Sequence, residues 1–306
     1  MIKGGVYIML LVGLILLSPF VSGGLIDWYN SITGKATSDE VVLNISVTAG
    51  TAPTVPTVYN NTITDVSSGL NEGPTKTTLK FNFTASDAEG YTNLNDSSAA
   101  ANFTLAGETT REGSCTRIAA ESSGNLANYS CSVDMFWWDG TGAWSITASI
   151  KDVNNNGAQN ASSTTFSVGT TAGVTLSPTT LAWASISPGA TNSEATSAVR
   201  LNNTGNLDRS TEVNGTSLKG ETNNAYALWA GNFTVKNAAG CGGETMSEAA
   251  FVNITSAHLP AGNFTIADGN TGQEDLYFCL ELAGTELTQQ AYSTDELGPW
   301  IIQIVA

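Results

Sequence analysis

Histidine is almost absent from this 306-residue chain, and basic residues are few. There is one histidine, and 11 Lys and Arg stand against 27 Asp and Glu, which gives a formal net charge of −16. Because nucleic acid and anionic lipid are themselves negative, we expect neither as a partner. A histidine base would have to be His258, in SAHLPAG, and we expect an exposed or hydrogen-bonded turn histidine there.

Several catalytic signatures are missing as well. No G-x-S-x-G elbow, S-x-x-K run, H-E-x-x-H helix or C-x-x-C pair occurs. The glycine-rich CGGE at residues 241–244 lacks the lysine and the following helix of a phosphate loop, so it indicates a disulfide-anchored turn. We therefore expect no enzyme activity. The alternative, a secreted carbohydrate-active enzyme, requires two of the 27 acidic residues to face each other across a cleft.

Helix-forming residues are scarce, whereas Ser, Thr, Asn and Gly abound. Only 12% of the residues are charged, and this composition is typical of short strands joined by polar turns. Residues 78–87 (TLKFNFTASD) and 143–152 (AWSITASIKD) alternate apolar and other side chains, as half-buried strands do. The sequence therefore predicts an all-β fold, with one short helix at most, over residues 244–252.

The N-terminus carries an apolar run between Lys3 and a group of small residues. This pattern predicts a secretory signal peptide over residues 1–23. Because no charge occurs between Lys3 and Asp27, the same span is long enough to anchor the chain in a bilayer if it stays uncut. A third alternative is a class III signal of the archaeal pilin kind, since the run directly follows KGG. The flexible composition of residues 24–40 indicates a tether.

Glycosylation acceptor patterns recur along the whole chain. The N-x-[ST] pattern occurs twelve times, which supports export. The asparagines are Asn44, Asn60, Asn82, Asn95, Asn102, Asn128, Asn160, Asn202, Asn214, Asn232, Asn253 and Asn263. Several of them lie in strand-like segments, where a glycan needs a solvent-facing position.

Two units of strands and turns follow the tether. Strand patterns begin at EVVLNISVTAG, and residues 169–173 (GTTAG) indicate a linker. The sequence predicts tandem β-sandwich domains over residues 41–168 and 174–306. Cysteines fall one pair in each half, so we expect the disulfides Cys115–Cys131 and Cys241–Cys279 in an oxidising compartment.

Parts of both units resemble a known group of modules. FNFTASDAEG, the run from NYSCSVDM to STTFSV, and SISPGATNSEATSAVRLNNTGN are similar to immunoglobulin-like and polycystic-kidney-disease-like modules of archaeal and bacterial surface proteins, over about half of the chain. The resemblance implies immunoglobulin-like β-sandwiches, an archaeal envelope and a spacer, adhesion or structural role. Cys115 and Cys131 are too close in sequence to join two sheets in the antibody manner, so we expect their bridge between neighbouring strands or in a loop.

Two acidic loops are candidates for a calcium site. SDAEGYTNLND carries Asp87, Glu89 and Asp96, and KDVNNNG opens with Asp152 like a D-x-N-x-N-G calcium loop, although no Glu stands at its twelfth position. If the preceding strands are the second and sixth of a sandwich, both loops leave it at the same end. The hypothesis is a calcium ion held there, and the alternative is a pair of solvated turns.

The segment FWWDGTGAW, residues 136–144, concentrates aromatic side chains. Extending the alternation of NYSCSVDM places Trp137 in the core and leaves Phe136 and Trp138 on the other face. Exposed aromatics of this kind stack on sugars or contact proteins. Because the following turn leaves the sandwich where the chain exits toward the second domain, we expect an interdomain contact at Phe136 and Trp138, with core capping and a sugar platform as alternatives.

These patterns together predict a secreted or membrane-tethered, glycosylated cell-surface protein that acts by adhesion, binding or building the envelope. Its expected partners are surface glycans, other envelope proteins and the membrane, the last through an uncleaved N-terminal segment. The first rival is a self-assembling pilus, filament or surface-layer subunit, for instance one that lends a strand to its neighbour.

Overall fold

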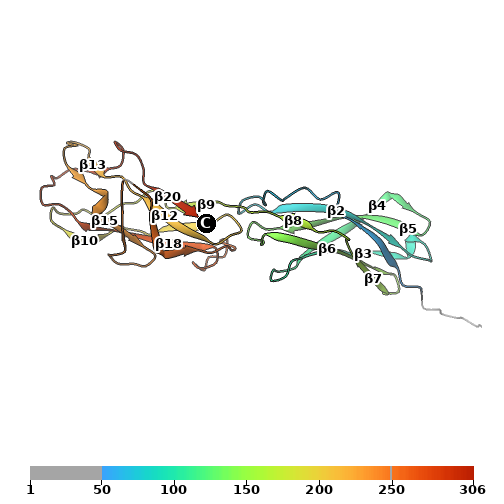
Figure 1. The fold of residues 1–306 in the computed structure, drawn as a ribbon. Helices are drawn as coiled ribbons and strands as arrows, with labels where there is room; N and C mark the ends of the chain where they lie inside the picture. Colours follow the sequence, from blue (N-terminus) through green and yellow to red (C-terminus); the bar gives the residue numbers. More distant parts are fainter. Residues whose placement is uncertain (1–49, 249) are drawn as a thin grey trace, which may run out of the picture. The chain divides into compact units, whose positions relative to one another are not determined.

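A computed structural model describes residues 50–248 and 250–306, and this part of the chain is all-β (Figure 1). Its two helical elements are single 3-10 turns, η1 (Tyr91–Asn93) and η2 (Ala230–Asn232). The strands are β1 (Thr54–Tyr59), β2 (Thr77–Ser86), β3 (Leu94–Thr104), β4 (Arg111–Ser123), β5 (Leu126–Met135), β6 (Gly142–Asp152), β7 (Gly157–Ala161), β8 (Phe166–Val168), β9 (Val174–Ser177), β10 (Thr191–Glu194), β11 (Val199–Asn203), β12 (Arg209–Asn214), β13 (Leu218–Gly220), β14 (Ala227–Leu228), β15 (Phe233–Lys236), β16 (Glu244–Thr245), β17 (Val252–Leu259), β18 (Gln273–Leu282), β19 (Tyr292–Ser293) and β20 (Ile301–Val305).

The strands β1 to β8 form one eight-stranded sheet, which we name the N-terminal β-region. Its order is β1-β2-β5-β4-β3-β6-β7, and β8 pairs with β6. The predicted alternation is present, because Phe81 on β2 and Trp144 on β6 are fully buried while their neighbours are more exposed. The two ends of the strand order also meet, since Asn160 Nδ2 of β7 donates to the Val55 carbonyl of β1 at 2.8 Å. The sheet thus wraps around one apolar core.

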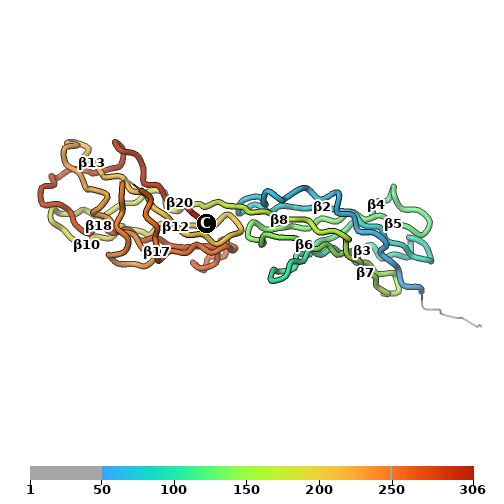
Figure 2. The backbone as a smooth tube through the Cα atoms, viewed as in Figure 1, coloured from blue at the N-terminus to red at the C-terminus, as the bar shows by residue number. Residues whose placement is uncertain are grey.

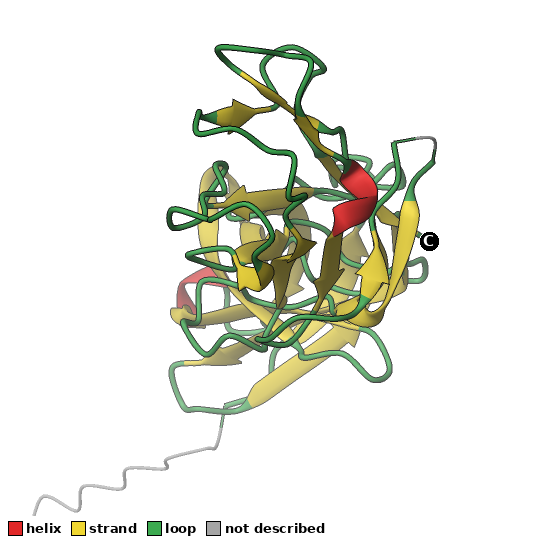
Figure 3. Cartoon of the chain, turned by 90° about the vertical axis from the view of Figure 1, so that its left-hand side faces the viewer, coloured by secondary structure: helices red, strands yellow, loops and turns green. Residues whose placement is uncertain are grey.

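The strands β9 to β20 form the C-terminal β-region, which is built of shorter strands and longer loops (Figures 2 and 3). Its main sheet has the order β16-β15-β18-β11-β9, with β10 also on β18, and the others are β17-β12-β20 and β14-β13-β19. Leu201, Phe233 and Leu276 are buried in a second core. No described strand of one region pairs with a strand of the other, so each region completes its strand ladders by itself.

The structure tests one of the two expected helical segments, the one over residues 244–252. The helix predicted over residues 244–252 is wrong, because Glu244–Thr245 pairs with β15 and β17 begins at Val252. Met246 is buried and donates its N–H to the Phe233 carbonyl at 2.9 Å, so tertiary pairing overrides local preference. In the described part of the chain, no helix has the length and apolar character to cross a membrane. The predicted signal or anchor, the tether and the strand pattern of residues 41–49 lie outside the described residues.

Candidate functional site

The two predicted disulfides are present. Cys115 and Cys131 stand directly opposite each other on the neighbouring strands β4 and β5, with their Cα atoms 4.0 Å apart. Cys241–Cys279 ties the glycine-rich turn before β16 to the central strand β18. This confirms the disulfide-anchored turn at CGGE, where Gly242 and Gly243 adopt positive φ angles. Each disulfide joins two cysteines of the same β-region, and neither disulfide links the two regions.

We expect the Cys115–Cys131 bridge to contribute about 3 kcal/mol to the free energy of unfolding, because it closes a loop of 16 residues. Replacing both cysteines with serine, measured by denaturant unfolding, should lower stability by that amount while the β4–β5 ladder persists. The matched measurement is the wild-type chain in reductant, which should lose at least as much. Unfolding of the double variant at the wild-type denaturant concentration would contradict the expectation.

The structure brings three of the four predicted calcium ligands to one end of the N-terminal β-region. Asp87 and Asp152 are buried, and Asn93 links their loops: its side chain donates to Asp87 Oδ2 at 3.1 Å, and its carbonyl accepts from the Val153 amide. Glu89 Oε1 accepts the amide N–H of Thr51 at 3.0 Å. This end of the region is where the described chain begins.

The carboxylates of these loops already have protein partners. Asp152 accepts the backbone and side-chain N–H groups of Asn156, both at 2.8 Å, and burial raises the pKa of Asp87 above its ordinary value. Asp96 is engaged elsewhere, by the Tyr129 hydroxyl at 2.8 Å and by Arg117 at 3.2 Å. The calcium hypothesis stays a prediction, which thermal melting with and without a chelator tests.

The aromatic segment divides as the alternation predicts. Trp137 is buried, whereas Phe136 and Trp138 are half-buried and stack on each other with ring centroids 4.6 Å apart. Two cations of the same chain lie against this pair: Lys76 Nζ is 4.9 Å from the Phe136 centroid, and Arg111 Cζ is 4.6 Å from it. A sugar ring on these faces would therefore have to share them with the chain's own cations.

Asp139 holds this aromatic and cationic cluster in place. Its carboxylate is fully buried and forms a bidentate ion pair with Arg111, with Nε 2.9 Å from Oδ1 and Nη2 bound to the same oxygen. The other oxygen accepts the amide N–H of Phe136 at 2.9 Å, which closes the turn after Trp138. The Arg111 guanidinium is thereby fixed over the Phe136 ring.

Trp137 contacts the C-terminal β-region, and the contact expected at Phe136 and Trp138 stays a prediction. The Trp137 ring lies 5.1 Å from the ring of Phe264, and Gly73 packs so closely on the indole that a Cβ there would lie 2.6 Å from ring atoms. Buried Asn206 donates its side-chain amide to the carbonyls of Asp139 (3.1 Å) and Gly169 (2.9 Å). We name these contacts the Trp137 junction.

The expected linker, residues 169–173, is part of the same junction. The Asn206 side-chain oxygen accepts the amide N–H of Thr171 at 2.8 Å, and the Thr171 hydroxyl donates to the Leu70 carbonyl at 3.0 Å. Thr171 is itself buried. Sequence reasoning missed Asn206, for which the signal was a dense polar run, NNTGN, between two strands.

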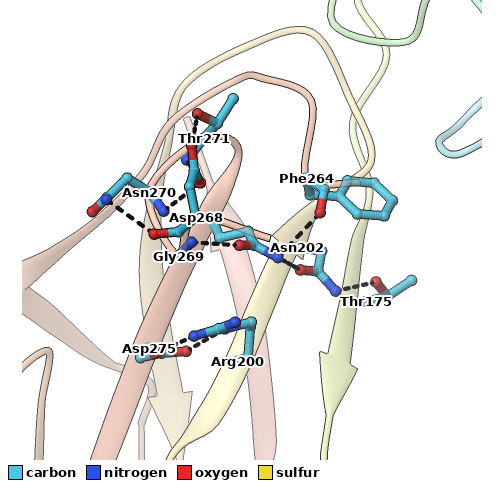
Figure 4. A network of polar contacts seen from close by, with 10 residues as sticks. Thr175, Arg200, Asn202, Phe264, Asp268, Gly269, Asn270, Thr271 and Asp275 are labelled. Carbon is cyan, nitrogen blue, oxygen red and sulfur yellow. Dashed lines mark hydrogen bonds and ion pairs between the residues drawn. The ribbon is translucent and has the colours of Figure 1, made fainter. Parts of the chain in front are cut away.

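A polar network positions Phe264 (Figure 4). Gln273 Nε2 donates to the Phe264 carbonyl at 3.2 Å and to Asn202 Oδ1 at 2.8 Å, while its Oε1 accepts the Gly269 amide. Asp268 closes the tip of this loop by accepting the amides of Asn270 and Thr271 and the Thr271 hydroxyl. The loop of residues 263–272 is thus tied to β11 through Gln273 and Asn202.

Acid should loosen this loop. The hydrogen bonds from the Thr271 side chain and the loop amides lower the pKa of Asp268 to about 2. Because the folded-state pKa lies below the unfolded value of about 4, this carboxylate stabilises the fold above about pH 4, and the effect is lost as the pH falls toward 2. We expect amide exchange of residues 269–272 to rise in that window. Asp268→Asn is the control: an equal acid-induced rise in that variant would contradict the role of the carboxylate.

The structure shows how exposed each glycosylation acceptor of the described residues is. All eleven sequon asparagines in the described residues are half-buried or exposed, including those on β2, β3, β5, β11 and β12. The two buried asparagines among the described residues, Asn203 and Asn206, both lie outside sequons. On the strands with a sequon the acceptor lies on the face away from the core, except on β7, where Asn160 pairs with the buried Ala148 and donates to the Val55 carbonyl of β1.

A cavity with apolar and polar lining residues, which the sequence did not indicate, lies in the C-terminal β-region. Its volume is about 1070 Å³, and it is lined by segments far apart in the chain, among them Leu176, Trp183, Phe233, Trp300 and Ile302. Trp300 lies against both other aromatics, with ring centroids 5.1 Å from Phe233 and 6.0 Å from Trp183. His258, by contrast, is exposed on β17, 3.5 Å from Asp208 and away from this cavity's lining.

Comparisons with known proteins add no family. No family model, no curated protein and no solved structure matches this chain.

Proposed function

We propose that this chain is a glycosylated cell-surface protein of two tandem immunoglobulin-like β-sandwich domains, residues 41–168 and 174–306, which acts by binding or by building the envelope. The observation that carries the proposal is the placement of the sequon asparagines. None of the eleven described acceptors is buried, two of them (Asn160 and Asn253) being exposed and nine half-buried, while the buried described asparagines are not acceptors.

The disulfides support the same compartment. Both join cysteines within one β-region and none of the four is left free, which is typical of proteins that fold outside the reducing cytosol. The separate cores of the two regions support two sandwich domains. Surface glycans and other envelope proteins are the proposed partners, and the N-terminal segment is the proposed route to the membrane.

Fractionation of source cells with mass spectrometry of the mature chain tests this proposal. We expect the chain in the surface fraction, with both disulfides formed and added glycan mass at several of the twelve sequons. The same spectrum reports whether residues 1–23 are retained. Recovery from the cytosol with four reduced, unmodified cysteines would overturn the proposal.

A self-assembling surface subunit is the second candidate, and one observation favours it. The cavity of the C-terminal β-region lies next to β9 and β20, which each pair on one side only among the described strands. Electron microscopy of the cell surface distinguishes the candidates, because ordered filaments or arrays favour assembly, whereas isolated molecules favour a solitary adhesion module.

A further inference from the structure

Two strand edges of the C-terminal β-region are open. Among the described strands, β9 pairs only with β11 and β20 only with β12. Neither VTLS nor IIQIV contains a charged residue or proline, the features that protect exposed edges from pairing with another chain. The opposite edge of the β20 sheet is protected: β17 has an irregular register with β12 and carries the exposed acceptor Asn253.

The inward-facing side chains on these two edges are incompletely covered. Leu176 on β9 and Ile302 on β20 pack against the core but stay half-buried, whereas Leu201 and Leu276 on the central strands are fully buried. Leu176 and Ile302 line the same cavity of about 1070 Å³, whose apolar wall includes Trp300. We name the space between β9 and β20 the slot. The side chains that β9 and β20 turn into it, Leu176 and Ile302, are apolar, whereas other parts of the cavity lining carry polar groups such as those of Gln290 and Asp295. The sides of the slot offer unpaired backbone N–H and C=O groups.

Residues 41–48 of the sequence match such a space. VVLNISVT places Val41, Leu43, Ile45 and Val47 on one face and Val42, Asn44, Ser46 and Thr48 on the other. An added strand gains affinity from backbone hydrogen bonds and specificity from alternate side chains that enter pockets. Here the apolar face fits the slot, and the acceptor Asn44 lies on the outer face, where a glycan can be carried.

The segment cannot reach the slot of its own chain. Gly50 lies beside the Asp152 loop, where its carbonyl accepts Asn156 Nδ2 at 3.3 Å. The strand β6 separates that loop from Gly142, which pairs with Val168 where the chain leaves the N-terminal β-region. Its ten residue steps span about 33 Å, and the slot lies beyond that end. Val41 lies nine residues before Gly50 and extends at most about 32 Å from it. A second copy must therefore supply the strand.

We propose that residues 41–48 of one copy insert as a β-strand between β9 and β20 of the next copy. This inference deepens the proposed surface role, on which it rests, by stating how copies join. The contact is heterologous, because the donating segment and the slot are different surfaces, so repeated donation builds a filament or a ring.

Sedimentation velocity of the exported chain tests the donated strand. We expect concentration-dependent association of the wild type and, for Leu43→Asp/Ile45→Asp, association weaker by at least about 100-fold, because two carboxylates would enter an apolar slot. The matched control is Val42→Asp/Thr48→Asp, which adds the same charge on the outer face of the segment and leaves the Asn44 sequon intact. This control should stay within about threefold of the wild type.

A peptide tests the slot without altering its fold. A synthetic peptide of residues 40–50 should bind the Leu43→Asp/Ile45→Asp chain, whose own segment does not compete, and should change tryptophan emission because Trp183 and Trp300 line the slot. It should also slow amide exchange of Ile301–Val305. The same peptide with both aspartates should do neither.

Three outcomes would overturn strand donation: wild-type assembly that survives Leu43→Asp/Ile45→Asp, a slot that does not bind the peptide, or a slot held by a lipid-like molecule that the peptide does not displace. An exported, glycosylated chain that remains monomeric rejects donation and leaves the surface role standing. A cytosolic chain with reduced cysteines rejects the surface role, while the peptide titration still decides donation.

Discussion

Replacing Asp139 with alanine should lower the free energy of unfolding by about 4 kcal/mol. The carboxylate is fully buried, and its partner Arg111 has only 13% of its side chain exposed. Removing one member of a buried ion pair leaves the other charge without compensation, which typically costs about 3–5 kcal/mol. The variant also leaves the amide N–H of Phe136 without its acceptor. Denaturant unfolding monitored by tryptophan fluorescence measures both effects together.

Asp134→Ala is the matched control for this prediction. Asp134 also pairs with a cation, Lys76 at 3.4 Å, but the two side chains are 42% and 53% exposed. An exposed pair contributes at most about 1 kcal/mol, so this variant should remain close to the wild type. Arg111→Met/Asp139→Leu should recover part of the loss by replacing the pair with apolar groups. Equal stabilities of Asp134→Ala and Asp139→Ala would contradict the buried-pair argument.

The sequence predicted the strand faces of the N-terminal β-region because period-2 alternation is a local property. Trp144 lies in the core as expected, Trp137 is buried as expected although it packs at the junction, and the turn lies between them. The meeting of the Asp87 and Asp152 loops was predicted from a different premise, that the preceding strands are the second and sixth of a sandwich and therefore end on the same side. Alternation thus placed the side chains of the strands, whereas the assumed strand order placed the loops.

The burial of Asp139 could not be predicted. An Asp-Gly pair in a turn is ordinarily solvent-exposed, and nothing local shows that Arg111, 28 residues earlier, returns to bind it. The same holds for Asn206, whose partners Asp139 and Gly169 lie 67 and 37 residues away. Such contacts depend on tertiary placement, which has no signature in a single segment.

The C-terminal β-region was harder to predict for a related reason. Its strands are short, several of two to five residues, so alternation has little length over which to show. The predicted helix over residues 244–252 failed because the local Glu and Ala content carries no information on pairing with β15. The slot depends on which edges remain unpaired, and that is decided by the whole sheet order.

Replacing Trp137 with alanine should uncouple the two β-regions. The indole is 3% exposed and packs on Phe264 and Gly73, so its removal should cost about 3–5 kcal/mol through lost burial and a cavity. The rest of the junction is mainly polar, for example the Asn206 bonds, which contribute about 1 kcal/mol each. We expect differential scanning calorimetry to resolve two transitions in place of a more cooperative one.

Two further substitutions separate apolar packing from hydrogen bonding at this position. Among the described residues, Trp137 Nε1 has no hydrogen-bond partner, so Trp137→Phe removes an unsatisfied buried donor while keeping an aromatic ring. That variant should stay within about 1 kcal/mol of the wild type and melt as it does. Trp138→Ala removes a half-buried ring that stacks on Phe136, so its smaller loss should be confined to the N-terminal β-region. If Trp138→Ala rather than Trp137→Ala separates the transitions, the contact between the regions depends on the outer aromatic pair, as the sequence alone had predicted.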